Sequence, residues 1–211
     1  MHAVTPADTP DAAPSEPPRK RPRPGERRVQ ILQTLAGMLE QPDSERITTA
    51  ALAARLEVSE AALYRHFASK AQMFEGLIEF IESSIFTLVN QIAEREVSGL
   101  AQAQKIVAVL LQFGERNPGM TRVMVGDALV YENERLVARM NQFFDRIESS
   151  LRQALRQAAE ASGSSTPTVE ANAQASVLIS FVIGRLQRYA RSGFKRLPSE
   201  QLEAALRMLA R

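Results

Sequence analysis

The chain has 211 residues and 45% hydrophobic content, which is enough to bury one sizeable core or a small domain beside a larger one. It contains no cysteine, which excludes disulfides, thiolate metal sites and cysteine nucleophiles and fits a reducing cytoplasm. The formal net charge is only +2, yet residues 19–70 carry ten Lys or Arg against six Asp or Glu, whereas residues 71–211 carry sixteen against fifteen.

Residues 1–24 are predicted to form a disordered, proline-rich arm, because they hold seven of the eleven prolines in company with Asp, Ala and Arg. The arm becomes basic over RKRPRPGERR at 19–28. Such a run is usually just solvated, and it becomes a phosphate-tracking arm if a DNA-binding domain follows at once. The chain does not begin with a basic cluster followed by an apolar run, so no secretory signal is expected.

Helical periodicity begins directly after the arm. Apolar residues at three- and four-residue spacing predict a first helix over 26–39, a second from Thr48 or Thr49, and a third capped by Ser59. The residues expected to face inward are Val29, Leu32, Leu35, Ala36 and Leu39, then Leu52, Ala53 and Leu56, then Ala62, Leu63 and Phe67.

A long fourth helix is predicted to start directly after Ser69, which serves as its N-cap. Its expected apolar stripe consists of Phe74, Leu77, Ile78, Ile81, Ile85, Leu88, Val89 and Ile92. At 100° per residue, Phe80 falls about 120° from the centre of that stripe, so core packing does not account for its ring. The ordinary explanation is a lone surface aromatic, since single exposed apolar residues are common.

Further helices are predicted over 101–116, 119–127, 131–161, 169–191 and 199–210, with a Gly-, Ser- and Thr-rich loop at 162–168. Asn117 and Pro118 end the first of these, because the residue before a proline avoids helical geometry. The expected inward residues are Ala103, Ile106, Val107, Leu110, Leu111, Leu136, Met140, Phe143, Ile147, Leu151, Leu155, Leu202, Leu206 and Leu209. With no strand alternation or internal repeat, the sequence predicts an all-α fold.

The longest apolar stretch is AQASVLISFVIGRL at 173–186. It is too short and too often interrupted by polar residues to span a bilayer, so no membrane anchor is expected. A helix that is apolar on all sides must be covered on all sides. We therefore expect a second subunit to cover it, with burial inside one subunit as the alternative.

Residues 48–67 have the pattern of a helix-turn-helix, in which the second of two short helices presents its N-terminal residues to base edges in the major groove. The joining segment 56–58 is short, and Ala53 is small enough for the two helices to cross closely. The predicted domains are therefore a helix-turn-helix domain at 25–70 and a helical core at 71–211 that is expected to carry dimerisation.

The string ITTAALAARLEVSEAALYRHFASKAQMFEGLIEF at 47–80 resembles the DNA-binding domain of the TetR family. The resemblance implies a TetR-like fold, in which a three-helix helix-turn-helix domain precedes a helical bundle that dimerises. It also implies that the homodimer binds palindromic sites in double-stranded DNA. One departure is Glu57, which stands where the family usually has glycine, and a left-handed backbone there would cost about 1 kcal/mol.

The same resemblance implies roles for individual residues. Phosphate contacts are expected from Arg27, Arg28, Thr48, Thr49 and Lys70. Base contacts are expected from Glu60, which could accept from a cytosine amine, and from Ala61, which could touch a thymine methyl. Ser59 would cap the recognition helix, and Tyr64, Arg65 and His66 would stand at its phosphate-facing end. For His66, packing against other side chains and contact with a phosphate are given equal weight.

Within that family, the strings SEAALYRHFASK, GLIEFIE and FGERNPG closely resemble the nucleoid occlusion factors. These proteins bind the tubulin-like division protein FtsZ once they are on DNA, and they block septum assembly over the chromosome. The resemblance implies that Phe80, Arg116 and Asn117 receive the C-terminal tail of FtsZ. Relatives have a basic residue at the position of Leu88 and a glycine at the position of Gln112. These two differences affect the details of the surface that receives the tail.

A ligand-responsive transcriptional repressor is the alternative function, and a drug-sized apolar pocket in the core would favour it. Filled packing around Phe113, Phe143, Phe144 and Phe181 would favour the division inhibitor. An enzyme is not expected, because His2 and His66 are the only imidazoles and no phosphate-binding loop or paired carboxylates stand out. No catalytic site, metal or cofactor is therefore predicted.

Overall fold

The computed structural model of the chain describes residues 25–41 and 46–210. Within these ranges the secondary structure is helical, which confirms the predicted all-α class. The elements are α1 (Glu26–Leu39), α2 (Thr49–Arg55), α3 (Glu60–Tyr64), α4 (Lys70–Arg95), α5 (Gly99–Arg116), α6 (Pro118–Met124), the 3₁₀-helix η1 (Asp127–Leu129), α7 (Glu134–Ala161), α8 (Pro167–Arg191) and α9 (Leu202–Leu209). The arm predicted for residues 1–24 lies outside the described residues.

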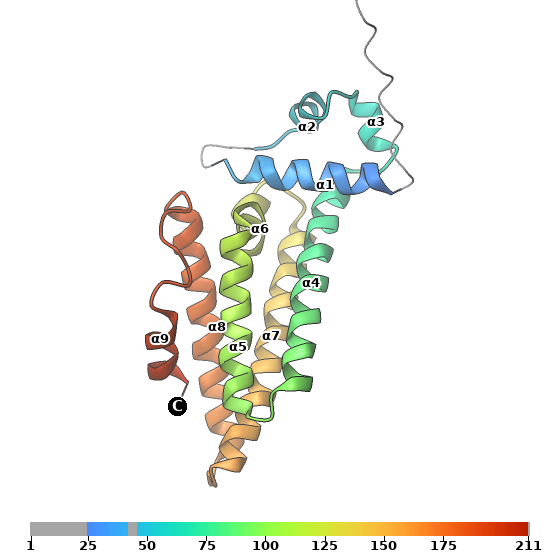
Figure 1. The fold of residues 1–211 in the computed structure, drawn as a ribbon. Helices are drawn as coiled ribbons and strands as arrows, with labels where there is room; N and C mark the ends of the chain where they lie inside the picture. The colour runs from blue at the N-terminus through green and yellow to red at the C-terminus, as the bar shows by residue number, and fades with distance from the viewer. Residues whose placement is uncertain (1–24, 42–45, 211) are drawn as a thin grey trace, which may run out of the picture.

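Figure 1 shows two layers. The short helices α2 and α3 lie above α1, which crosses the top of a bundle formed by α4, α5, α7 and α8. The C-terminal helix α9 lies along the outer side of α8. Because α4 begins beside α3 and runs down the bundle, one helix connects the two layers.

Side-chain caps explain where several helices begin. The hydroxyls of Thr48, Ser59 and Ser69 accept hydrogen bonds from the backbone N–H groups of Ala51, Ala62 and Gln72, at 3.1, 3.3 and 3.2 Å. Each bond satisfies one of the amide groups that lack a partner within the first turn of a helix. The caps predicted at Ser59 and Ser69 are confirmed, and Thr48 rather than Thr49 caps α2.

The interior of the bundle is filled by the predicted faces of α5 and α7. All the inward residues expected in these two helices are buried: Ala103, Ile106, Val107, Leu110, Leu111, Leu136, Met140, Phe143, Ile147, Leu151 and Leu155. The ring of Phe143 packs edge-on against Phe86 of α4 and against its neighbour Phe144, at centroid distances of 5.7 and 5.1 Å. Aromatic packing of this kind fixes α4 against α7.

Two residues expected to face inward are exposed. The prediction for Val29 was wrong because α1 buries Ile31, Leu35 and Leu39, and Val29 lies about 160° around the helix from Ile31. The prediction for Leu88 was also wrong, since 40% of this residue is exposed. It lies about 60° from Ile85, at the edge of the buried stripe, where α4 turns its surface toward solvent.

Some predicted helix bounds also differ from the observed ones. The helix expected from residue 131 begins at Glu134, because the Asn133 side chain accepts the N–H of Arg135 at 3.1 Å and caps it there. The helix expected over 119–127 ends at Met124 and is followed by η1. The last helix, expected over 199–210, is shorter and covers Leu202–Leu209.

Helix α8 is buried along one face only. Ala175, Leu178 and Val182 are buried in the bundle, whereas Val177 on the opposite side is 49% exposed. Burial inside one subunit, the alternative considered from the sequence, therefore accounts for only half of this helix. Among the residues that the structure describes, no helix is long and apolar enough to cross a bilayer.

The layer formed by α1, α2 and α3 rests on α6. A Cβ atom added to Gly119 would lie 2.1 Å from the carbonyl oxygen of Ala36, so only glycine lets α6 approach α1 this closely. Beside this contact, Nη1 of Arg122 lies 3.4 Å from the carbonyl oxygens of Leu39 and Gln41. The end of α1 is thus fixed to the core at α6.

Candidate DNA-binding and partner-binding surfaces

Helices α2 and α3 are joined by a tight turn. The N–H of Val58 donates to the carbonyl oxygen of Ala53 at 3.0 Å, and Glu57 adopts a left-handed backbone with φ 55°. The residue that departs from the family pattern therefore has the strained conformation, at a cost of about 1 kcal/mol. Leu52 and Leu63 are buried beneath the turn, so the apolar underside predicted for this motif is present.

The outward side of α3 is polar and accessible. We call Ser59, Glu60, Ala61, Tyr64 and Arg65 the recognition face, and all five residues are exposed. The Thr49 hydroxyl donates to Oε2 of Glu60 at 2.6 Å, which holds that carboxylate at the start of α3. His66 is also exposed, so packing does not require its imidazole.

Arg28 links α1 to the end of α3. Its Nη1 donates to the carbonyl oxygen of His66 at 2.9 Å, and its guanidinium carbon lies 4.1 Å from the centroid of the Phe67 ring. Arg27 instead donates to Gln30 on its own helix at 2.8 Å. Both arginines lie at the N-terminal end of α1, and the motif alone did not indicate that Arg28 has a structural role as well.

Lys70 is engaged by the core. Its ammonium group donates to the Glu132 carboxylate just before α7, and it lies 5.6 Å from the centroid of the Phe74 ring. Only 17% of the Lys70 side chain and 7% of the Glu132 side chain are exposed. A phosphate would therefore have to compete with Glu132 for this cation, which the sequence pattern did not indicate.

The second candidate surface lies between α4 and α5. Phe80 is 48% exposed, and its ring centroid lies 6.4 Å from that of Phe113, which faces it from α5. Arg116 is the exposed last residue of α5, one helical turn beyond Phe113. Asn117 follows it, and its side-chain amide donates to the carbonyl oxygen of Phe113 at 2.8 Å. We call these four residues the partner surface.

Sequence reasoning identified three members of the partner surface and assigned Phe113 to core packing instead. Phe113 is only half-buried and lies against Phe80. The exposed ring at Phe80 could have signalled a neighbour on α5, because aromatic rings prefer to pair. Leu88 and Gln112, the two departures from the family pattern, are both exposed on these same two helices.

Helix α4, which carries Lys70 and Phe80, is held to α7 by charged contacts. Arg135 pairs with Glu75 at 2.8 Å, and Arg139 pairs with Glu82 at 2.6 Å. The hydrogen bonds from Arg139 to the Glu82 carboxylate raise the pKa of the guanidinium above its ordinary value. Farther along, Arg146 lies 3.9 Å from the centroid of the Phe86 ring. These contacts make α4 a stiff connection between the two candidate surfaces.

Two family models match the chain. Residues 31–77 match the bacterial regulatory proteins of the tetR family, and residues 98–211 match the tetracyclin repressor-like C-terminal domain of the SlmA-like type. The fold is similar to that of the TetR family transcriptional regulator PfmR from Thermus thermophilus, with a TM-score of 0.70 and 18% identity over 87% of this chain and 95% of that one.

Two curated relatives are much more similar in sequence. The nucleoid occlusion factor SlmA of Idiomarina loihiensis is 52% identical over 178 residues, which cover 84% of this chain and 90% of the relative. The SlmA of Photobacterium profundum is 50% identical over 185 residues, which cover 87% and 94%. The matching family is one of bacterial regulatory proteins, which is not a class of enzymes. The chain belongs to the TetR family and, within it, to the SlmA nucleoid occlusion factors.

Proposed function

We propose that this nucleoid occlusion factor binds palindromic DNA sites as a homodimer and, while bound, captures the C-terminal tail of FtsZ and prevents septum assembly over the chromosome. The protein would then act on the nucleoid in the cytoplasm. The observation that carries the proposal is the aromatic pair Phe80–Phe113 beside Arg116, because the hydrophobic core does not require Phe80 at its exposed position.

The recognition face supports the DNA half of the proposal. In the major groove, Glu60 and Ala61 at the start of α3 would meet base edges, while Ser59, Tyr64, Arg65 and His66 would lie close to the phosphates. Arg27, Arg28, Thr48 and Thr49 would extend the phosphate contacts from α1 and α2. Lys70 would join them if a phosphate replaced Glu132 as its partner.

The partner surface supports the second half. An extended peptide with apolar and acidic residues would bury its apolar side chain against the two rings and pair a carboxylate with Arg116. Asn117 already donates to the carbonyl oxygen of Phe113, and its remaining amide hydrogen could bind the peptide backbone. Leu88 makes the α4 side of this surface more apolar. This favours a tail whose side chains offer more apolar surface for burial.

Two routes connect the surfaces and support coupling between them. Helix α4 carries both Lys70 and Phe80. Helix α6 begins directly after Asn117 and contacts α1 through Gly119. DNA that fixes the orientation of α1, α2 and α3 would also fix the N-terminal end of α4 and the C-terminal end of α5. These are the two helices that form the partner surface. If the coupling is thermodynamic, the tail must raise DNA affinity by the same factor.

The packing of the bundle favours this function over a ligand-responsive repressor. The ring of Phe143 contacts those of Phe86 and Phe144, and Phe143 is fully buried. This part of the interior is filled by the protein's own side chains. Phe113 and Phe181 are only partly buried, and the former contributes to the partner surface instead.

The exposed face of α8 is the surface we assign to dimerisation. Val177 is half-exposed there, with Ser180 and Gly184 following on the same face, so a second helix could approach closely. We expect Val177→Asp to convert the dimer to a monomer, because pairing would bury the new carboxylate without a partner. Sedimentation velocity measures this, and a dimer that persists would place the interface elsewhere.

The partner surface is tested with Phe80→Ala and Arg116→Ala. We expect each variant to bind DNA like the wild type and to lose inhibition of FtsZ polymerisation, measured by light scattering in the presence of DNA. Glu79→Ala, an exposed neighbour on α4, is the matched control and should retain inhibition. Loss of DNA binding in the two test variants would show instead that the surface is structural.

A further inference from the structure

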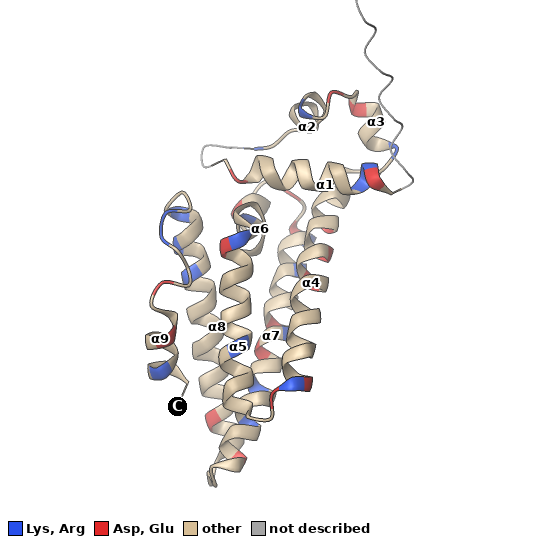
Figure 2. Ribbon diagram, viewed as in Figure 1, with Lys and Arg blue, Asp and Glu red and all other residues tan. Residues whose placement is uncertain are grey.

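The first residues of α2 and α3 are joined by a hydrogen bond between their side chains. The hydroxyl of Thr49 donates to Oε2 of Glu60 at 2.6 Å, although the two residues are 11 positions apart in the sequence. Such a bond to an ionised carboxylate is stronger than a bond between neutral groups. Figure 2 shows acidic positions where α3 begins. The two helices thus hold a carboxylate at the start of the helix that would enter the major groove.

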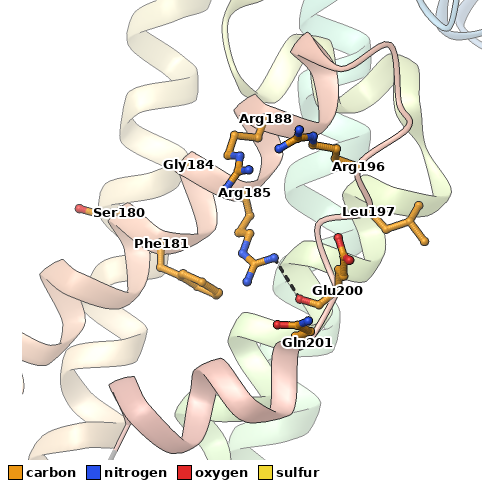
Figure 3. A pocket seen from close by; sticks show the side chains of 9 residues that line it. All are labelled: Ser180, Phe181, Gly184, Arg185, Arg188, Arg196, Leu197, Glu200 and Gln201. Atoms are coloured by element: carbon orange, nitrogen blue, oxygen red, sulfur yellow. Dashed lines mark hydrogen bonds between the residues drawn. The ribbon is translucent and has the colours of Figure 1, made fainter.

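Thr49, rather than a cation, is the partner of Glu60. Other carboxylates are placed differently: Glu75 and Glu82 each pair with an arginine of α7, and Figure 3 shows Glu200 in a hollow that it shares with three arginines. Among the residues that the structure describes, no Lys or Arg forms an ion pair with Glu60. The Thr49 hydroxyl is therefore the contact that fixes the direction of this carboxylate.

The two neighbouring threonines use their hydroxyls differently. The Thr48 oxygen accepts the N–H of Ala51 at 3.1 Å, and this bond does not use the hydroxyl hydrogen, which can donate to a phosphate. The Thr49 hydroxyl has only one hydrogen, and it donates that hydrogen to Glu60. Any phosphate contact made by Thr49 is then left to its backbone N–H.

The bond from Thr49 leaves the other oxygen of Glu60, Oε1, for the groove. In the major groove the amine of cytosine donates a hydrogen bond, whereas guanine and the carbonyl of thymine present acceptors. A carboxylate that faces an acceptor is repelled and stays without a partner once water has left the groove. A carboxylate that rotates freely avoids this penalty by turning away, whereas one that is held in place cannot.

We infer that Thr49 is a positioning residue that sets the sequence preference of α3. By holding Oε2 of Glu60, it directs Oε1 to the amine of a cytosine. The inference rests on the proposed DNA-bound function and assigns Thr49 a part in reading the sequence, beyond the phosphate contact that the family pattern implies. The side chain of Thr49 itself does not touch the base.

The test measures base preference in DNA binding. The probe is a duplex with a palindromic site that the wild-type protein selects from random-sequence DNA, together with duplexes that are changed at one base pair of one half-site. The base pair at which Glu60→Ala loses discrimination is the one that Glu60 reads. At that pair, the wild type should bind cytosine about ten- to one-hundredfold more tightly than guanine or thymine.

Thr49→Val replaces the hydroxyl with a methyl group of similar size. We expect its preference for cytosine at that pair to fall by about five- to tenfold, with unchanged preferences at the other pairs and the wild-type circular dichroism spectrum. Thr49→Ser keeps the hydroxyl and should retain most of the preference. In the Glu60→Ala background, Thr49→Val should alter no base preference, because the carboxylate that Thr49 holds is gone.

Glu60→Gln tests the direction of the held group without any change in α2. Thr49 can donate only to the oxygen of the new amide, which turns the amide NH₂ group toward the base. The preferred base should therefore change from cytosine to one that presents an acceptor in the major groove. A Glu60→Gln variant that still prefers cytosine would overturn the inference.

Two further results would also overturn it. One is a Thr49→Val variant that keeps the wild-type base preference, whether or not it binds all duplexes more weakly, because the hydroxyl would then contact a phosphate or support the fold. The other is a wild-type preference that Glu60→Ala leaves intact at every base pair. A wild-type protein that selects no duplex would instead contradict the proposed function itself.

Discussion

The recognition face and the partner surface are built in different ways. The recognition face lies on a helix of five residues, and its polar side chains are held by the Ser59 cap and by the bond from Thr49 to Glu60. The partner surface lies on two helices of 26 and 18 residues and on the residue that caps the second, and it consists of two rings, a cation and the Asn117 amide. The recognition face is suited to a DNA groove, which is charged and varies in shape. The partner surface is suited to a peptide that binds to a preformed site.

The comparison also shows what connects the two surfaces. Lys70 belongs to the DNA-binding string, yet its ammonium group pairs with Glu132 in the core. Gly119 belongs to the core, yet it contacts the backbone of α1. Substitutions at these contacts should affect both surfaces, whereas substitutions on either surface alone should affect one.

The largest effect on stability is expected for Glu132→Gln. It leaves the mostly buried ammonium of Lys70 without its carboxylate and should lower the free energy of unfolding by roughly 2–3 kcal/mol, somewhat below the value for a fully buried pair. Urea denaturation measures the loss. Lys70→Met/Glu132→Leu removes both charges and should recover most of it, because an apolar pair of similar size needs no solvation. If the double variant is as unstable as the single one, packing rather than charge explains the effect.

Gly119→Ala is expected to have the next largest effect. The new methyl group would clash with the Ala36 carbonyl and should cost about 1–3 kcal/mol, with weaker coupling between DNA and tail binding. Gly37→Ala on α1 is the control, since nothing lies within 4 Å of its added Cβ. That variant should stabilise the protein by about 1 kcal/mol through helix propensity. Similar changes in both variants would contradict a close contact between α1 and α6.

Arg65→Ala should separate the two surfaces by function. It removes an exposed cation at the end of α3 and should reduce the salt slope of DNA binding by about one unit. Circular dichroism should show the wild-type helix content. Affinity for the FtsZ tail without DNA should not change, and a matching decrease in tail affinity would mean that α3 supports the partner surface directly.

The smallest effect is expected for Glu57→Gly. Glycine relieves about 1 kcal/mol of strain at the left-handed position, but it also makes the unfolded chain more flexible. A net gain of about 0.5 kcal/mol is expected in thermal unfolding, with unchanged DNA affinity. A loss of stability would mean that contacts of the Glu57 side chain exceed the strain.

The sequence predicted the helices and most of the core because apolar spacing and caps are local signals. It could not predict that Lys70 pairs with Glu132, since the two residues meet only when α4 and α7 pack together. The exposure of Leu88 was missed for a similar reason, because a residue at the edge of a stripe is buried or exposed according to its neighbours. The exposure of Phe80 was predicted because the residue lies outside the apolar stripe of its helix. Its partner Phe113 was assigned to core packing, so its place beside Phe80 was not predicted.

The most direct test of the central claim is the affinity of the purified protein for a peptide of the FtsZ C-terminal tail, measured by fluorescence anisotropy with and without a saturating duplex. The account predicts tighter binding of the tail when DNA is present, and an equal increase in DNA affinity when the tail is saturating. Identical tail affinity in both conditions would contradict the claim that occupation of α3 shapes the surface formed by α4 and α5.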